Sequence, residues 1–326
     1  MIDELMTPPT YYDVLEALPR VHAVLQPTLL RNWPGLSEAL GFECWLKHEN
    51  HQPVGAFKVR GGVNLVGTLS DDERRTGILG VSTGNHGQSL AFAAKHSGVH
   101  CTIVVPQGNN PDKNRAIRQL GAELIEHGRD FDEAREFVTE LQRQRGGRYV
   151  HSANEPALIA GVGSLACEVF DKLPDPDVML VPIGLGSGVA AACIVAKHLR
   201  PEIKVIGVQA ENASAVVRSW RSGRHETDAS ISTWAEGLAT RVPADLTMQI
   251  MREHMDDAIL VGEDDMRHAV ALILQHTHNL AEGAGAATVA AAFKHRERFG
   301  DKRVVAVLSG GNLDLKQLPS ILAKLA

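Results

Sequence analysis

The sequence predicts an α/β protein built on two doubly wound, mostly parallel sheets. Short apolar runs of strand length alternate with longer segments of helical periodicity along nearly the whole chain of 326 residues. This alternation favours parallel strands joined by crossover helices. The length suffices for two domains with a large shared core, and 44% hydrophobic with 22% charged residues is ordinary for a soluble globular protein.

Each expected element is identified by its apolar spacing and by the residues that interrupt it. A helix near Thr10 would place Val14, Leu15 and Leu18 on one face, and Asp112 is expected to cap a later helix. The expected strands are residues 42–47, 78–81, 101–105, 123–125, 178–181, 205–208 and 304–308. The expected helices, besides the one near Thr10, are residues 58–69, 85–94, 112–120, 131–145, 163–173, 189–199, 263–277 and 284–294.

Charge and cysteine usage narrow the class of protein. The formal net charge is -6 and no long basic run is present, so nucleic acid is not an expected partner. The four cysteines are far apart and form no Cys-x-x-Cys pair, which is typical of reduced cysteines in a cytoplasmic protein. Asp3 and Glu4 stand where a signal peptide would carry positive charge, and no apolar run reaches membrane-spanning length. A cytoplasmic protein without membrane contact is expected.

One lysine, Lys58, has features that suit a reactive amine. It follows a Pro/Gly turn, lies between Phe57 and Val59, and precedes a glycine pair where an irregular segment gives way to a helix. Partial burial and the neighbouring cation Arg60 would both disfavour the ammonium form, so the amine could lose its proton and attack an aldehyde. The alternative is that Lys58 is an ordinary solvated lysine.

A glycine-rich turn between an expected strand and helix is a candidate phosphate site. It consists of Gly184, Leu185, Gly186, Ser187 and Gly188. Backbone N–H groups and the positive end of the helix dipole can hold a phosphate there, because glycine lets the anion approach the backbone. A plain tight turn is the alternative. A dinucleotide site is disfavoured, because the spacing is not G-x-G-x-x-G and the turn comes late in the chain.

A second loop offers donors suited to a carboxylate. Ser82, Thr83, Gly84, Asn85 and His86 supply hydroxyls, an amide and backbone N–H groups at the start of a helix. Helix capping by Ser82 or Thr83 alone is the alternative, although the run of neighbouring polar and glycine residues favours a binding loop.

Lys58, these two loops and the run 309–312 occur in the order found in fold-type II pyridoxal-phosphate enzymes. From about Leu25 to Asn312 the chain resembles this family, most closely its threonine dehydratase and serine racemase branch. The resemblance implies a large cofactor-binding domain, residues 1–62 and 153–326. It implies a small substrate-binding domain, residues 63–152, inserted in the larger one, with the active site between them. It also implies a homodimer.

The resemblance implies pyridoxal 5'-phosphate as cofactor and assigns roles by position. Lys58 would carry the cofactor and later abstract the substrate's α-proton, while Asn85 would bond the ring hydroxyl and Ser309 would face the pyridine nitrogen. Glu282 would lie close to the ring, unless it is only a helix-start charge. The cofactor-binding residues expected on this basis are Phe57, Lys58, Asn85, Gly184, Leu185, Gly186, Ser187, Gly188, Glu282 and Ser309. The substrate carboxylate is expected at Ser82, Thr83, Gly84, Asn85 and His86.

By resemblance the chain is a dehydratase that converts a β-hydroxy amino acid, such as L-threonine or L-serine, to a 2-oxo acid and ammonia. It is also similar to dehydratases of hydroxyectoine utilisation and to phenylserine dehydratases. Ala56 and Gly62 depart from the family's usual Ser and Ala, and we expect both to border the substrate. An amino-acid racemase and a non-catalytic cofactor carrier are the rival classes.

Two departures bear on racemase activity. Metal-activated relatives carry an acidic pair where this chain has Gln209 and Ala215, so no metal site is expected there, despite the nearby Glu211. Family racemases use a serine where this chain has Thr83, which keeps the hydroxyl and adds a methyl group. Racemisation is therefore disfavoured.

Overall fold

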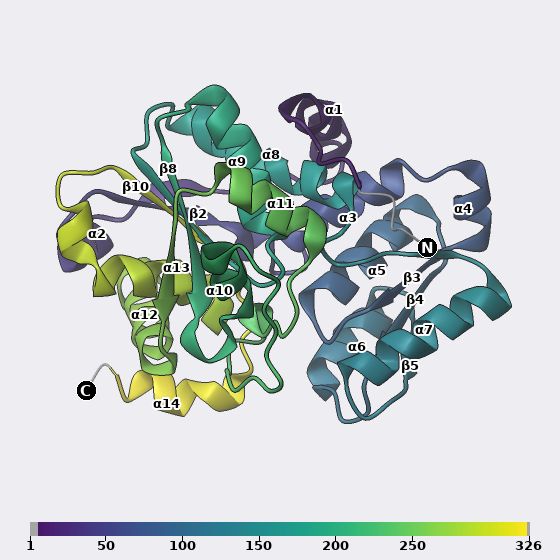
Figure 1. Ribbon diagram of the computed structural model, residues 1–326. Coiled ribbons are helices and arrows are strands. Elements are labelled where there is room, and N and C mark those ends of the chain that lie inside the picture. Colours follow the sequence, from purple (N-terminus) through teal and green to yellow (C-terminus); the bar gives the residue numbers. More distant parts are fainter. Residues whose placement is uncertain (1–5, 325–326) are drawn as a thin grey trace.

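The computed structural model describes residues 6–324 and contains two sheets, each packed between helices (Figure 1). Asp3 and Glu4 lie outside the described residues. None of the helices within residues 6–324 has the combination of length and apolar content that a membrane crossing requires.

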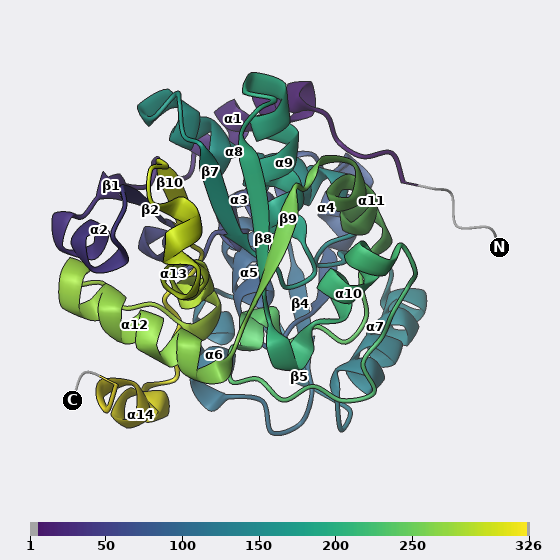
Figure 2. The same cartoon turned by 60° about the vertical axis from the view of Figure 1, so that its left-hand side comes forward.

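The larger sheet has six strands, and its strand order differs from the chain order. The order is β1 (Leu30–Asn32), β2 (Cys44–His48), β10 (Val304–Leu308), β7 (Val178–Pro182), β8 (Lys204–Ala210) and β9 (Asp257–Val261). Neighbours are parallel except β1 and β2, which are antiparallel. Figure 2 shows β7, β8 and β9 side by side. Every residue of β7 and β10 is buried, as central strands covered on both faces require.

The smaller sheet has four parallel strands and comes from one continuous stretch of chain. Its order is β5 (Glu123–Glu126), β4 (Cys101–Val105), β3 (Ile78–Val81) and β6 (Arg148–Tyr149). It forms the right-hand part of Figure 1, and in the sequence its strands fall between β2 and β7.

Two apolar clusters cover each sheet, one on each face. On one face of the larger sheet lie α1 (Tyr11–His22), α8 (Pro156–Lys172), α9 (Ser187–Leu199), α10 (Ala215–Ser222) and α11 (Asp245–His254). On the other lie α2 (Pro34–Leu40), α12 (Glu263–Thr277), α13 (Gly283–Lys294) and α14 (Leu318–Leu322). The smaller sheet packs against α3 (Lys58–Gly67), α5 (Asn85–Ser97) and α6 (Pro111–Gln119) on one face and α7 (Phe131–Arg145) on the other, with α4 (Asp71–Thr76) following α3.

The predicted fold class is confirmed, and the helices 131–145 and 263–277 and the strand 304–308 have the expected bounds. Three details are wrong. The helix expected from residue 163 already begins at Pro156, and Leu15 is 39% exposed, so it is not a core residue. Asn110, not Asp112, caps α6, since its side chain accepts hydrogen bonds from the N–H groups of Asp112 (2.9 Å) and Lys113 (3.4 Å). Elements not expected are β1, β6, β9, α2, α4, α10, α11 and α14.

A buried ionic cluster fixes α3 to the larger sheet. The fully buried guanidinium of Arg60 donates to Glu49 (Nε to Oε2, 2.7 Å) and to Glu168 (Nη1 to Oε1, 2.6 Å), and Lys47 also pairs with Glu168. Burial would raise the pKa of Glu168, but the bonds and charges of Arg60 and Lys47 outweigh it and lower the pKa to about 2. Two carboxylates, Glu49 and Glu168, therefore balance two cations, Arg60 and Lys47.

Removing Arg60 should strongly destabilise the protein. The substitution Arg60→Met leaves two carboxylates in the interior without their principal counter-charge, which costs about 3–5 kcal/mol for a broken buried pair. Urea denaturation followed by circular dichroism measures this loss. The matched control is Arg129→Met, because Arg129 forms an exposed pair with Glu133, and its midpoint should not move. Equal midpoints for both variants would show that the cluster contributes no net stability.

Candidate functional site

Backbone pairing holds Lys58 at the carboxyl end of a central strand. Phe57 N–H donates to the carbonyl of Ser309 (3.0 Å), Gly311 N–H donates to the carbonyl of Gly55 (2.9 Å), and a single antiparallel bridge joins the residues between them. Ser309 directly follows β10, so Lys58, the first residue of α3, lies where ligands bind in open α/β sheets.

The amine of Lys58 is half-buried and has no carboxylate partner in the described part of the chain. Its Nζ lies 3.4 Å from Ser187 Oγ and 5.1 Å from the centroid of the Phe57 ring. Burial lowers the pKa of Lys58 to about 8. The expectation that Arg60 assists this shift is wrong, because Arg60 is paired within its own cluster. Roughly a tenth of the amine is neutral at pH 7, a far larger share than for an exposed lysine.

The glycine loop is a ready receptor for an anion. Within residues 6–324, none of the backbone N–H groups from 184 to 189 meets an acceptor, although residues 186–189 are buried. Gly186 has φ +95°, a conformation that favours glycine, and forms the N-cap of α9. A Cβ on Gly184 would lie 2.3 Å from the carbonyl oxygen of Gly237. Buried donors without partners require an acceptor, and a phosphate at this helix N-terminus fits them.

The loop 82–86 presents a second set of free donors. The N–H groups of residues 85, 86 and 87, at the start of α5, have no acceptor among the described residues, and Ser82 Oγ accepts from Gly84 N–H (3.2 Å). The His86 ring is buried, with Nε2 3.4 Å from the Val150 carbonyl, and burial lowers the pKa of His86 to about 3. The ring is therefore neutral and supports the loop, which offers its backbone to a carboxylate.

A hydrogen-bonded chain of three side chains joins this loop to the larger sheet. Asn312 Nδ2 donates to Asn85 Oδ1 (2.8 Å), and Asn85 Nδ2 donates to Glu282 Oε1 (2.7 Å). Burial raises the pKa of Glu282, and the bond from Asn85 only partly opposes this shift. Sequence reasoning did not include Asn312 among the site residues, although its place at the end of the run 309–312 was a usable signal.

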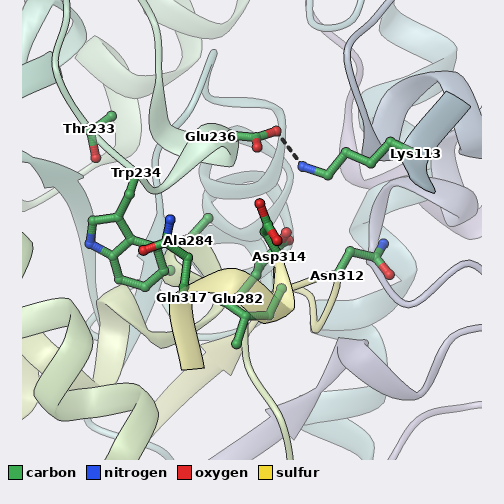
Figure 3. A pocket seen from close by; sticks show the side chains of 11 residues that line it. Lys113, Thr233, Trp234, Glu236, Glu282, Ala284, Asn312, Asp314 and Gln317 are labelled. Carbon is green, nitrogen blue, oxygen red and sulfur yellow. Dashed lines mark hydrogen bonds and ion pairs between the residues drawn. The ribbon is translucent and has the colours of Figure 1, made fainter. Parts of the chain in front are cut away.

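A cavity of about 210 Å³ lies beside this chain. Figure 3 shows Trp234, Glu282, Asn312 and Asp314 around it. An ion pair crosses it from Lys113 of α6 to Glu236 in the short helix η3 (Glu236–Leu238). The pair links the part of the protein that holds the smaller sheet to the part that holds the larger. Sequence reasoning missed both residues, since nothing local marks a pair 123 positions apart.

Gly62, which we expected to border the substrate, packs against Ser89 of α5. A Cβ on Gly62 would lie 2.4 Å from Ser89 Oγ, and a Cβ on Gly61 would lie 2.7 Å from the carbonyl oxygen of Leu158. The glycine pair therefore lets α3 pack closely against α5 and α8. Ser89 Oγ occupies the space beside Gly62 and donates to the carbonyl of Lys58 (2.6 Å).

The positions compared with a metal site hold neutral groups. Gln209 is fully buried, and its Oε1 accepts from Val217 N–H (2.9 Å). Ala215 is also buried and has no ligand atom. Among residues 6–324, no cluster of three or more His, Cys, Asp or Glu side chains could hold a metal ion.

Fold and site together define an α/β enzyme that anchors an anionic cofactor beside a reactive lysine. A family model described as "Pyridoxal-phosphate dependent enzyme" matches residues 22–310. The chain therefore belongs to the family of pyridoxal-phosphate dependent enzymes, and its cofactor is pyridoxal phosphate. The unpartnered donors of the glycine loop and the half-buried Lys58 fit this cofactor's phosphate and aldehyde.

Proteins with related sequences and structures agree with this assignment. The L-threonine ammonia-lyase of Thermotoga maritima is 38% identical and aligns over 97% of this chain and 78% of its own length. The processed threonine deaminase isoform 2 of Solanum lycopersicum has a TM-score of 0.91 at 28% identity, covering 98% of this chain and 95% of its own. Maize serine racemase has a TM-score of 0.92 at 26% identity, covering 98% of both chains.

The shifted pKa predicts an unusual reactivity for Lys58 in the cofactor-free protein. Only the neutral amine attacks an aldehyde, so its rate of reductive alkylation by pyridoxal should rise with pH around a midpoint of about 8. Lys95, which is exposed, serves as the reference site for labelling of an unburied amine. Mass spectrometry of the labelled peptides across a pH series measures both rates. A labelling rate of Lys58 that keeps rising up to the ordinary lysine pKa of about 10.4 would contradict the assigned shift.

Proposed function

We propose that this protein is a lyase that converts a β-hydroxy-α-amino acid, with L-threonine and L-serine as the leading substrates, to a 2-oxo acid and ammonia. The observation that carries the proposal is the Lys58 amine, which lies 3.4 Å from Ser187 of the anion-binding loop and has a pKa of about 8. A group of this pKa serves as a base near neutral pH. The similarity to the L-threonine ammonia-lyase supports the substrate class.

The reaction needs a base at the α-carbon and stabilisation of the charge that forms there. Bound pyridoxal phosphate supplies the electron sink for that charge. As a free amine, Lys58 would remove the α-proton, and this proton and the β-hydroxyl would leave together as one molecule of water. Hydrolysis of the unsaturated product then consumes one molecule of water and gives the 2-oxo acid and ammonia. The net reaction therefore releases ammonia and no water.

Other residues orient the reactants. The free N–H groups at residues 85–87 would receive the substrate carboxylate, and the Asn85 amide would meet the cofactor's ring hydroxyl. Ser309, 5% exposed, would face the pyridine nitrogen with a neutral hydroxyl. A neutral partner stabilises ring charge less than a carboxylate would, which fits elimination of a β-substituent.

Within this proposal, residues 1–62 and 153–326 form the cofactor-binding domain and residues 63–152 the substrate-binding domain. The strands support this division, because those of the larger sheet all lie in the first two ranges and those of the smaller sheet all lie within residues 63–152. The boundary at residue 62 falls inside α3, so this helix joins the two domains.

The assignment predicts that Lys58→Ala lowers release of 2-oxo acid from L-threonine or L-serine about 1,000-fold or more, since it removes both the attachment point and the base. The visible absorbance band of the lysine-bound cofactor, which borohydride abolishes in the parent protein, should be absent. The control is Lys95→Ala, a change at an exposed lysine of α5, which should keep full turnover.

The same assay separates the rival functions. Appearance of the opposite enantiomer of serine without 2-oxo acid would make the protein a racemase, as the likeness to maize serine racemase allows. Fastest turnover of threo-phenylserine or of a hydroxyectoine-derived amino acid would reassign the substrate within the same reaction. An absorbance band without any product would indicate a cofactor carrier, and full turnover by Lys58→Ala would refute the lyase mechanism.

We also propose a cytoplasmic homodimer. Four free cysteines suit a reducing compartment. Tyr12 (67% exposed) and Leu15 (39%) on α1, with Leu199 (44%) at the end of α9, are exposed apolar side chains that a second copy would cover.

Sedimentation velocity should give a dimer, and the double change Tyr12→Glu and Leu15→Glu should shift it towards monomer. A monomeric parent protein would exclude this assembly.

A further inference from the structure

The helix α11 touches the glycine loop through one buried hydroxyl. Thr247, fully buried in the first turn of α11, donates to the carbonyl of Leu185, which lies 62 residues earlier in the chain. A second acceptor, the Ala244 carbonyl, lies 3.2 Å away within the helix's own first turn. Threonine in a helix commonly makes only this local bond. Here the Leu185 carbonyl is nearer to the Thr247 hydroxyl than the Ala244 carbonyl is, so the principal hydrogen bond of the hydroxyl is to the glycine loop.

The bonded carbonyl belongs to a peptide that has two possible orientations. Gly186 has φ +95° and ψ 0°, which matches the third position of a type II turn. In a type I turn the same central peptide is turned over, and the third residue has negative φ. Glycine adopts both conformations at little cost, so Gly186 by itself does not fix the Leu185–Gly186 peptide.

The orientation of this peptide decides which of its groups lies on each side of the loop. The C=O of Leu185 and the N–H of Gly186 point in opposite directions, because the peptide is planar and trans. With the carbonyl held against α11, the N–H of Gly186 is directed away from α11. It is one of the buried donors from 186 to 189 that meet no acceptor in the described part of the chain. A flipped peptide would replace that donor with a carbonyl oxygen, which repels an anion.

Close packing leaves Thr247 as the group that holds this orientation. A Cβ placed on Gly186 would lie 3.1 Å from Thr247 Cβ, from Thr247 Oγ1 and from Met251 Cε. Of these neighbours, only the threonine hydroxyl can donate a hydrogen bond to the carbonyl.

We propose that Thr247 is a positioning residue: its hydroxyl holds the Leu185–Gly186 peptide in the orientation that presents the Gly186 N–H to the cofactor's phosphate. Thr247 does not touch the cofactor and acts through the loop. This rests on the proposed assignment of the loop 184–188 to the phosphate.

Binding of two ligands to the cofactor-free protein tests the proposal. Pyridoxal phosphate and pyridoxal share the ring and the aldehyde and differ in the phosphate, so fluorescence titration with each isolates the phosphate site. Thr247→Val, which replaces the hydroxyl with a methyl group of similar volume, should weaken binding of pyridoxal phosphate about 10-fold to 100-fold, the loss of one hydrogen bond to a charged group. It should leave pyridoxal binding unchanged. Thr247→Ser keeps the hydroxyl and should bind both ligands like the parent protein.

The control is Thr277→Val in α12, which removes an equally buried hydroxyl that donates to the Ile273 carbonyl (2.6 Å). It should change neither affinity. If Thr247→Val does not fold, Thr247→Ala replaces it, since it removes the hydroxyl without adding bulk.

Three results would overturn the proposal. If Thr247→Val weakened the binding of both ligands equally, Thr247 would have only a structural role. If it left the binding of pyridoxal phosphate unchanged, the hydroxyl would not fix the orientation of the Leu185–Gly186 peptide. A selective loss in Thr277→Val would make the effect unspecific. A parent protein that binds pyridoxal as tightly as pyridoxal phosphate would refute the phosphate assignment itself, and this is distinguishable from failure of the lyase activity, which the turnover assay reports.

Discussion

The pairing of two short backbone segments, residues 55–57 and 309–311, is the contact on which the site depends. It joins the segment before α3 to the end of β10, so the position of Lys58 relative to the sheet is set by main-chain hydrogen bonds rather than by flexible side chains. Glycine at Gly310 leaves room for the Glu282 carboxylate, since a Cβ there would lie 2.3 Å from Glu282 Oε1. Gly285 packs equally closely on the carbonyl of Gly310 from the other side. The backbone pairing thus holds Lys58, Glu282 and Ser309 close to one another.

Lys58 and Arg60, both in the first turn of α3, lie in surroundings that favour different charge states. Successive residues of a helix are rotated by about 100°, so Lys58 and Arg60 point to nearly opposite sides of α3. Arg60 lies in an interior that supplies two carboxylates, and its charge is retained. Lys58 lies in a half-buried site with a hydroxyl and an aromatic ring, and its charge is easily lost. One helix therefore carries both a structural cation and a reactive amine.

The sequence is most informative where structure depends on local periodicity. The helices α7 and α12 and the strand β10 are clear because their apolar spacing is regular and glycine or polar residues end them. The strand β9 and the helix α11 escaped prediction because they follow a long polar segment whose ends give no strong signal. The position of the α6 cap was misjudged because Asn110 and Asp112 are both good capping residues. In the site, the glycine and lysine motifs were visible. The partners Thr247 and Lys113 were not, because tertiary contacts alone bring them to the loops.

The strand order has a consequence for the order in which the protein can be assembled during its synthesis. All four strands of the smaller sheet lie between residues 78 and 149, so this sheet can form as soon as its own stretch has left the ribosome. In the larger sheet β10 lies between β2 and β7, although it follows every other strand of residues 6–324 in the chain. Until residue 308 emerges, β2 and β7 each expose an unpaired apolar edge. The larger sheet, whose last strand leads into Ser309, is therefore completed later than the smaller one.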